Sequence, residues 1–269
     1  MKLSKDSPLL GKRVLVTRTR AQAIELVDLL SSLGAIPILA PTIQIVGPRN
    51  PEPLEDICSS IDKFDWIVFT SSNGVGFFMK HYVKIKGENA RLPAQVCAIG
   101  PSTAKCLKNF NVAVDFIPEE HRAEAVLAGL QERDSLTGKY VLLPRGDLAN
   151  KMLPTELKKC GALVTEITCY RTLLADHTDS SGENIYKTLN QQGIDIVTFT
   201  SASTVKNFVE ILGKPSALDF LNSACVASIG PVTAKAAAEL GIRTTITPIK
   251  YTIPSLVDAI VNHYTGNKT

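Results

Sequence analysis

An eight-residue stretch occurs twice in this chain, and this repeat constrains the fold more than any other feature. "AIGPSTAK" spans residues 98–105 and "SIGPVTAK" spans 228–235, with six of eight letters identical. The similarity continues outside the stretch, because residues 11–18 align with 138–145 and residues 33–45 align with 160–172 without a gap. Arrays of small repeats have periods of about 20–50 residues, so this longer period indicates a duplicated domain.

Each copy alternates short β runs with helical patterns. The β runs are apolar and β-branched without strict alternation, which is typical of strands buried on both faces of a parallel sheet. Residues 21–34 repeat apolar positions at helical spacing and end in glycine, a common helix terminator. We therefore predict an α/β protein of two doubly wound parallel-sheet domains. The predicted strands are residues 13–18, 66–71, 95–100 and 112–118 in the first copy, and 140–146, 195–201, 225–230 and 243–248 in the second.

Composition narrows the classes of partner and compartment. The net charge of +3 is too mild to favour nucleic acid as a partner. No apolar run approaches the roughly 18 residues that a membrane span needs, and the polar start "MKLSKDSPLLGKR" predicts no secretory signal. The six cysteines form no CxxC motif and several lie in apolar runs, which predicts reduced core residues. We expect a cytoplasmic protein, or a plastid stromal one if the chain is a processed precursor.

The loops after the strands are small, hydroxyl-rich and repeated. Ligands of open α/β sheets bind beyond the carboxyl ends of the strands. Gly100 and Gly230 are expected to turn the backbone sharply, and the hydroxyls of Ser102, Thr103 and Thr233 follow at a helix start. Free N–H groups and hydroxyls there favour an anion. Ordinary helix capping is the alternative for any single loop, but several such loops together predict a cleft that binds carboxylate or phosphate.

Several common motifs are missing. The chain has no GxGxxG after a strand, no GxxxxGK[ST], no HExxH and no GxSxG. We therefore expect no nucleotide cofactor and no metal, and a ligand held by hydroxyls, backbone amides and arginines. The four histidines, Trp66, Asp65 and Asp195 are interpreted as structural residues.

The ordered motifs resemble the uroporphyrinogen-III synthase family from about residue 11 to about residue 262. They are Gly-Lys-x-Val-Leu-x-x-Arg at the first strand, "FTSSNGV", "FTSASTV", "IGPSTAK", "SIGPVTAK" and "CYRT". The resemblance implies two flavodoxin-like lobes that are not consecutive, with residues 1–37 and 173–269 in one domain and 42–168 in the other. Connectors at about 36–46 and 163–173 would join the lobes as a two-stranded β linker.

The resemblance also implies a reaction. A hydro-lyase of this family closes hydroxymethylbilane, a linear tetrapyrrole with an acetate and a propionate on each ring, to uroporphyrinogen III. Water is lost and ring D is inverted, whereas uncatalysed closure gives isomer I. Selecting one fold of a flexible substrate is mainly an orientation problem, which fits the absence of a triad or metal motif. The resemblance implies no cofactor, a monomer, and a possible hand-over of substrate from hydroxymethylbilane synthase.

Resemblance places Tyr170 at the family's tyrosine in the second connector, where its phenol could assist departure of the hydroxyl. Packing between the lobes is the alternative role. Arg18 and Arg145 end matching strands and either pair with substrate carboxylates or are solvated strand ends. The complete set of predicted substrate contacts is Arg18, Thr70, Ser71, Ser72, Gly100, Ser102, Thr103, Arg145, Thr200, Ser201, Ser203, Gly230 and Thr233.

Two other function classes stay open at this stage. One is a non-catalytic bilobal binding protein for a small polyanion, against which the absence of a signal segment argues. The other is a Rossmann-type transferase or dehydrogenase, against which the missing glycine fingerprint argues.

Overall fold

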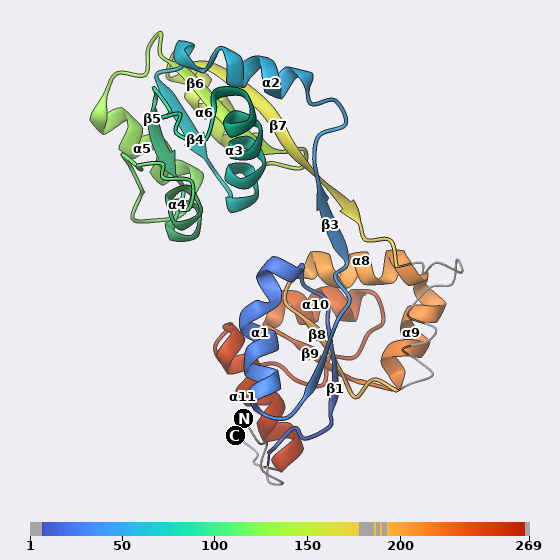
Figure 1. The fold of residues 1–269 in the computed structure, drawn as a ribbon. Coiled ribbons are helices and arrows are strands. Elements are labelled where there is room, and N and C mark those ends of the chain that lie inside the picture. The colour runs from blue at the N-terminus through green and yellow to red at the C-terminus, as the bar shows by residue number, and fades with distance from the viewer. Residues whose placement is uncertain (1–6, 178–185, 187–188, 190–192, 267–269) are drawn as a thin grey trace. The chain divides into compact units, whose positions relative to one another are not determined.

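The computed structural model describes residues 7–177, 186, 189 and 193–266 (Figure 1). The chain divides into two compact units, Met1–Gln44 with Leu173–Thr269 (unit 1) and Ile45–Thr172 (unit 2). Both units are α/β with parallel strand pairs, as the sequence predicts. Within the described ranges, no helix is both long and apolar enough to cross a membrane.

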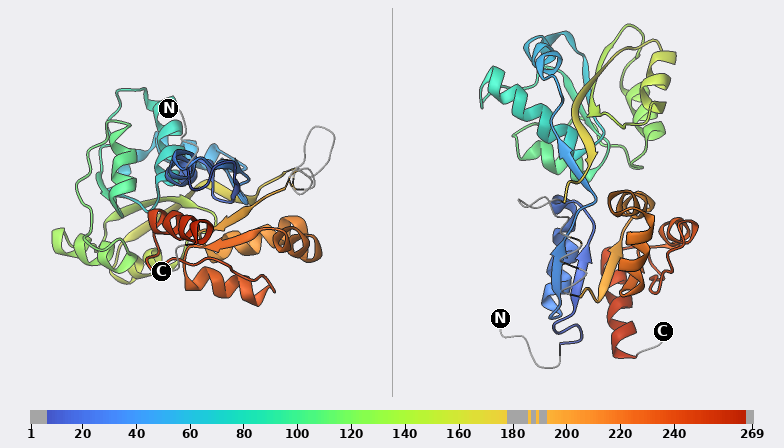
Figure 2. Two further views of the ribbon diagram at one scale, coloured as in Figure 1. Left: turned by 90° about the horizontal axis from the view of Figure 1, so that it is seen from below. Right: turned by 90° about the vertical axis from the view of Figure 1, so that its right-hand side faces the viewer.

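Unit 1 is built on a sheet of four strands in the order β2-β1-β8-β9. Alternate residues of each strand face opposite sides, so Leu15 and Val197 pack under helices α8, α9 and α10, whereas Val14 and Ile196 pack under α1 and α11. Figure 2 shows the ribbon of this unit from two further directions. Both faces are buried, which explains the continuous apolar runs. The elements are β1 (Arg13–Val16), α1 (Arg20–Ser32), β2 (Ile36–Leu39), β8 (Ile196–Phe199), α8 (Ala202–Leu212), α9 (Lys214–Asn222), β9 (Cys225–Ser228), α10 (Pro231–Glu239) and α11 (Ile253–Thr265).

Unit 2 has a sheet of five strands in the order β3-β7-β6-β4-β5. Helices α2, α3 and α4 cover one face, and α5 and α6 cover the other. The elements are β3 (Ile43–Val46), α2 (Glu52–Ser59), the 3₁₀ helix Ile61–Lys63, β4 (Trp66–Phe69), α3 (Ser72–Lys86), β5 (Gln95–Ala98), α4 (Pro101–Lys108), α5 (Ala123–Arg133), β6 (Tyr140–Gly146), α6 (Met152–Lys159) and β7 (Leu163–Leu174).

An aspartate at the edge of the sheet fixes the same strand pairing in both units. The Asp65 carboxylate accepts the backbone N–H of Tyr140 at 2.8 Å, at the start of β6. In unit 1 the Asp195 carboxylate accepts the N–H of Arg13 at 2.8 Å, at the start of β1. Each aspartate therefore holds a strand that is distant in sequence beside its own strand, and the structural interpretation of both residues is confirmed.

The last predicted strand of each copy is not a strand. Residues 112–118 and 243–248 make only isolated bridges, Cys97 with Phe116 and Ala227 with Ile246. In a parallel ladder the next hydrogen bond would come from the residue two positions further on. Those residues are Pro118 and Pro248, which have no N–H to donate. The ladder therefore stops after one bridge.

The two predicted connectors differ in continuity. The second is a single strand, β7, of 12 residues. The first is interrupted between β2 and β3, where the N–H of Thr42 bonds the carbonyl of Thr17 and the carbonyl of Thr42 accepts from Ala175. Strands β3 and β7 are neighbours in the unit 2 sheet, and the division between the units falls inside both strands.

Candidate functional site

A pocket of about 420 Å³ lies at the carboxyl ends of the unit 2 strands. Thr70 and Ser71 follow β4, Arg145 and Gly146 end β6, and Tyr170 stands on β7. This edge of a parallel sheet is where ligands of open α/β folds bind. The volume is within the range of about 300–1,000 Å³ that small-molecule pockets have.

Ser71 connects a helix start to the tyrosine. Its extended backbone makes it the N-cap of α3, and its Oγ accepts the N–H of Gly74 at 3.0 Å. The same oxygen lies 3.2 Å from the phenol oxygen of Tyr170, where either hydroxyl can be the donor. The Tyr170 ring also stacks on Phe77, with ring centroids 6.0 Å apart. The phenol is therefore held in place at the pocket wall by one hydrogen bond and one ring contact.

Gly146 provides the space that the Tyr170 ring occupies. A Cβ on residue 146 would lie 2.6 Å from ring atoms of Tyr170, closer than side chains approach. The β6–β7 register shifts between Arg145 and Gly146, so that Tyr170 pairs with Gly146 while Thr168 pairs with Arg145. This register shift places the Tyr170 ring next to Gly146, which has no side chain to obstruct it.

Arg145 is not a solvated strand end. Its side chain is 8% exposed, and its Nη1 donates to Oε2 of Glu166 at 3.0 Å. Nη2 donates to the carbonyl oxygen of Asn150, and the Nζ of Lys151 lies 3.0 Å from the same Glu166 oxygen. Burial would raise the pKa of Glu166, but hydrogen bonds and charge from Lys151 and Arg145 lower that pKa overall. The guanidinium is thus committed to an internal ion pair.

The structure corrects the predicted reason for glycine at positions 100 and 230, which precede the helices after β5 and β9. Gly100 has φ −169° and Gly230 has φ −177°, extended conformations that any residue adopts. A sharp turn is therefore not the reason for glycine there. A Cβ would lie 3.1 Å from the His121 ring at position 100, and 3.0 Å from the Tyr251 ring at position 230. Close packing of an exposed aromatic ring against each backbone therefore favours glycine, since any side chain would require the ring to shift by a few tenths of an ångström.

The hydroxyls predicted at these helix starts have different surroundings. Thr103 is 2% exposed and Thr233 is 3% exposed, so both face the interior of their units. Ser102, beside Thr103, is exposed. Ser72 lies within the first turn of α3 next to the Ser71 cap.

The remaining predicted residues lie in unit 1. Ser201 caps α8 in a capping box with Thr204, and its Oγ is 2.9 Å from the hydroxyl of Ser203. Thr200 directly follows β8, and Arg18 follows β1 two residues beyond its end. The structure therefore brings Thr70, Ser71, Arg145 and Tyr170 together in one pocket, and groups Arg18, Thr200, Ser201 and Ser203 at the corresponding edge of the unit 1 sheet.

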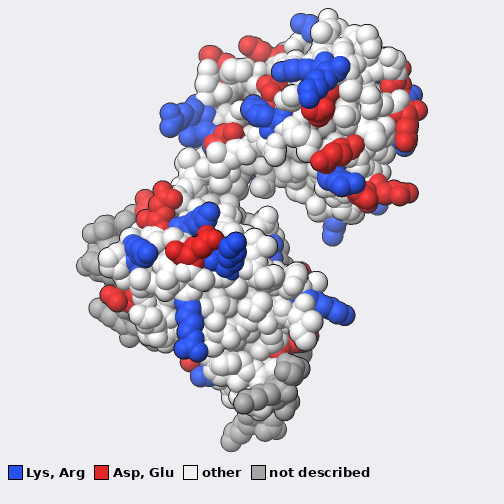
Figure 3. Space-filling view, turned by 180° about the vertical axis from the view of Figure 1, so that it is seen from behind, with Lys and Arg blue, Asp and Glu red and all other residues white. Residues whose placement is uncertain are grey.

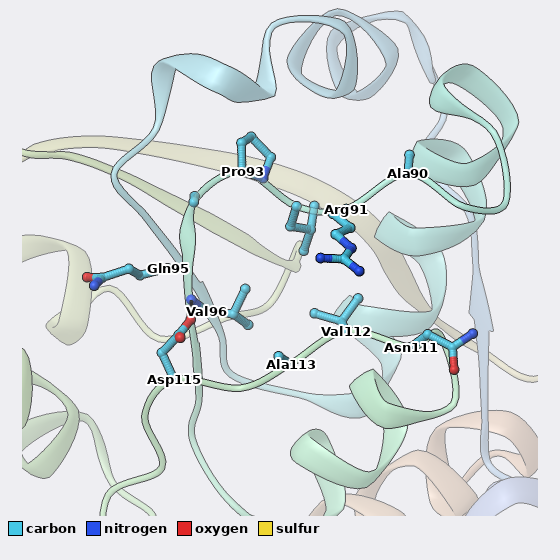
Figure 4. Close-up of a pocket in the computed structure, with 11 residues that line it drawn as sticks. Ala90, Arg91, Pro93, Gln95, Val96, Asn111, Val112, Ala113 and Asp115 are labelled. Carbon is cyan, nitrogen blue, oxygen red and sulfur yellow. Dashed lines mark hydrogen bonds between the residues drawn. The ribbon is translucent and has the colours of Figure 1, made fainter.

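Unit 2 has a larger pocket, of about 560 Å³, at the opposite edge of its sheet. Its lining residues 90–96, 111–113 and 115 lie before and at the start of β5 and before the Phe116 bridge, so the pocket lies at the amino ends of the strands. Figure 4 shows Arg91 pointing into this pocket and Gln95 pointing away from it. Because ligands of open α/β sheets bind at the carboxyl edge, we assign the chemistry to the smaller pocket.

The face shown in Figure 3 carries no concentration of charge of one sign. On the face in Figure 3, basic and acidic side chains are interspersed over both units. Among the described residues, no group of three or more His, Cys, Asp or Glu could hold a metal ion.

Sequence reasoning missed Glu166, Asn150 and Gly146. Glu166 is a lone carboxylate in the strand "LVTEITCYRT". A carboxylate in a partly buried strand is costly unless a cation pairs with it. The isolated Glu166 in this strand could therefore have indicated a nearby buried arginine or lysine.

Comparisons with known proteins agree on one family. The family model described as "Uroporphyrinogen-III synthase HemD" matches residues 24–258. The chain is 33% identical over 247 residues to a relative from Methanothermobacter thermautotrophicus, covering 91% of this chain and 96% of the relative. It is 31% identical over 254 residues to "Uroporphyrinogen-III synthase" from Chlorobaculum parvum, covering 93% and 98%. A crystal structure of a mutant uroporphyrinogen III synthase from Thermus thermophilus superposes with a TM-score of 0.58 at 20% identity, covering 96% of this chain and 100% of that one.

Proposed function

We propose the reaction of this chain from one premise, which is that the chain belongs to the uroporphyrinogen-III synthase family. On this premise the chain is a lyase that closes hydroxymethylbilane to uroporphyrinogen III, with loss of water and inversion of ring D. This family assignment favours an enzyme over a polyanion-binding protein and over a nucleotide-dependent enzyme.

The chemical step to be assisted is departure of the terminal hydroxyl. The pyrrole nitrogen pushes its electron pair toward the carbon that bears the hydroxyl, and the carbon–oxygen bond breaks. The leaving hydroxide takes up a proton and becomes water, the pyrrole N–H gives up its proton, and an azafulvene remains, so the net change is loss of one water. We propose that the Tyr170 phenol donates a hydrogen bond to this oxygen. The substituted carbon of ring D then attacks, and the enzyme favours this route by holding one substrate conformation.

One observation carries the proposal. The Tyr170 phenol lies 3.2 Å from the Ser71 hydroxyl, at the wall of a pocket on the ligand-binding edge of the sheet. Ser71 Oγ accepts the N–H of Gly74 and still has its own proton, so we propose that Ser71 is the donor in its contact with Tyr170. The phenol proton is then free to point into the pocket.

The other predicted contacts remain part of the proposal. We propose that the hydroxyls of Thr70, Ser71 and Ser72, and of Thr200, Ser201 and Ser203, contact substrate carboxylates. We propose the same for the helix starts at Gly100, Ser102 and Thr103, and at Gly230 and Thr233. Thr103 and Thr233 are buried, so a contact through them would use the backbone N–H groups of the first helical turn.

The test is product analysis. The protein is mixed with freshly prepared hydroxymethylbilane, the product is oxidised, and the porphyrin isomers are separated. Isomer III as the main product supports the proposal. Isomer I in the amount that forms without protein would contradict it.

We further propose that the chain works as a cytoplasmic monomer that receives bilane from hydroxymethylbilane synthase. Six free cysteines, three of them fully buried, fit a reducing compartment. Light scattering during turnover, with and without the synthase, tests both the monomer and the hand-over.

A further inference from the structure

Arg145 has a counterpart in unit 1 at the same place relative to its sheet. On the β6–β7 pair, Leu143 lies opposite Glu166 and the arginine stands two residues beyond Leu143. On the β1–β2 pair, Val16 lies opposite Leu39, and Arg18 stands two residues beyond Val16. The two arginines therefore end equivalent strands, but the position of the Glu166 carboxylate is taken by leucine in unit 1.

Because unit 1 has no carboxylate at this position, the Arg18 guanidinium lacks the ion-pair partner that Arg145 has. Arg145 has Glu166 and a backbone carbonyl as partners. Arg18 and Arg145 each have a buried Nε with no hydrogen-bond partner, so the two side chains differ at their terminal nitrogens. Within the described part of the chain, Arg18 makes no ion pair, whereas Arg145 pairs with Glu166. Burial lowers the pKa of the Arg18 guanidinium, and the charge of Glu25, an exposed residue of α1, offsets this only in part. A partly desolvated cation without an ion pair is unfavourable in isolation.

The surroundings of Arg18 suit an anion. Val16 pairs with Thr198, so the chain beyond β8 that carries Thr200 and Ser201 leaves the same edge of the sheet. Hydroxyls and the N-terminus of α8 follow there. An arginine fork matches a carboxylate with two parallel hydrogen bonds, and such charge-assisted bonds are about twice as strong as neutral ones.

We infer that, of these two arginines, Arg18 binds a substrate carboxylate, whereas Arg145 is a positioning residue that holds β6, Glu166 and the Asn150 loop together. This inference rests on the proposed function. Arg145 has a structural role because the neighbouring strand supplies Glu166 as its partner. Arg18 is left to bind a ligand because leucine occupies the equivalent position.

The first experiment compares Arg18→Gln with Arg20→Gln, which removes the same charge from an exposed position on the same segment. KM and kcat are measured with hydroxymethylbilane, and the dissociation constant of uroporphyrin III, an octacarboxylate, is measured by fluorescence. We expect Arg18→Gln to raise KM and the dissociation constant by about 10-fold or more, because a charge-assisted contact is lost. Arg20→Gln should stay within about twofold of wild type. Equal values for the two variants would overturn the inference.

The second experiment supplies the missing acid. Leu39→Glu should give Arg18 an internal partner and raise KM as Arg18→Gln does, whereas Leu39→Gln, which is polar but uncharged, should have little effect. Melting temperatures of both variants show whether they fold. Equal KM values for the two folded variants would contradict the inference.

The outcomes separate the inference from the proposed function. Wild-type protein that yields no isomer III would remove the proposed function. Wild-type protein that yields isomer III, with uroporphyrin binding that Arg18→Gln leaves unchanged, would remove only the assignment of Arg18.

Discussion

The phenol oxygen of Tyr170 lies 3.2 Å from Oγ of Ser71, and the same Ser71 oxygen accepts the N–H of Gly74 at 3.0 Å. One serine hydroxyl therefore both caps α3 and restrains the tyrosine. This coupling means that the position of the phenol depends on the start of α3 and on the space at Gly146.

Gly146→Ala should displace the Tyr170 ring. The new Cβ would lie 2.6 Å from the ring, and the ring end can rotate away from Ser71 more easily than the backbone can move. We expect turnover to fall by about tenfold, toward the lower end of general-acid contributions, with a small loss of stability. Gly76→Ala is the matched control, because no atom lies within 4 Å of its Cβ and alanine favours the helix. If Gly146→Ala keeps full turnover, the close contact has no role in the reaction.

Ser71→Ala should affect both stability and activity. Loss of an N-cap costs about 1 kcal/mol, which lowers the melting temperature by a few degrees in a chain of this size. Thr252→Ala removes the cap of α11, where the hydroxyl accepts from Ser255, and provides the control. We expect similar melting temperatures for the two variants and a lower kcat only for Ser71→Ala. A kcat that falls equally in both would attribute the effect to stability.

Glu166→Gln should destabilise the chain in a pH-dependent way. The pKa of Glu166 is lowered, so its ion pairs stabilise the folded chain fully above the ordinary Glu pKa of about 4.3. That stabilisation is lost as the pH falls through the lower folded-state pKa. The difference in free energy of unfolding between wild type and Glu166→Gln should therefore be largest near pH 7 and shrink below about pH 4. Chemical denaturation across this range measures it.

The control for that experiment is Glu156→Gln, which removes an exposed ion pair with Lys159. Surface pairs contribute about 0–1 kcal/mol, so this variant should stay close to wild type at every pH. A difference for Glu166→Gln that does not vary with pH would contradict the role of the ion pair.

Activity should survive EDTA treatment and desalting. The sequence has no metal or nucleotide motif, and the described residues contain no cluster of three metal-ligating side chains. We expect the initial rate with hydroxymethylbilane to match untreated protein. Restoration only after adding a divalent metal would contradict this prediction.

The fold class could be predicted from the sequence because buried parallel strands leave continuous apolar runs such as residues 66–69 and 196–199. The last strand of each copy was overpredicted, since the β-branched run at residues 243–248 has the right composition. Its failure depends on Pro248 lying at the one position where the ladder needs an N–H. That requirement is a matter of register, which composition does not contain.

The candidate site could be predicted only in part. The sequence predicts Tyr170 and Ser71 as site residues, but the contact between them depends on a register shift between Arg145 and Gly146, which the sequence does not reveal. The two arginines were treated alike, because a repeat alignment compares residues at one position and not the residues opposite them across the sheet. The difference between Glu166 and Leu39 becomes informative only when the strand pairing is known.

The central claim is that the Tyr170 phenol assists departure of the hydroxyl, and Tyr170→Phe tests it most directly. Initial rate and isomer ratio are measured on the same samples, with the melting temperature as a folding control. General-acid contributions are about 10²–10⁴-fold, and we expect the low end or below, because the pyrrole nitrogen already drives the step. The account predicts slower turnover with isomer III still the product. A folded Tyr170→Phe variant with the full wild-type rate and pure isomer III would contradict it.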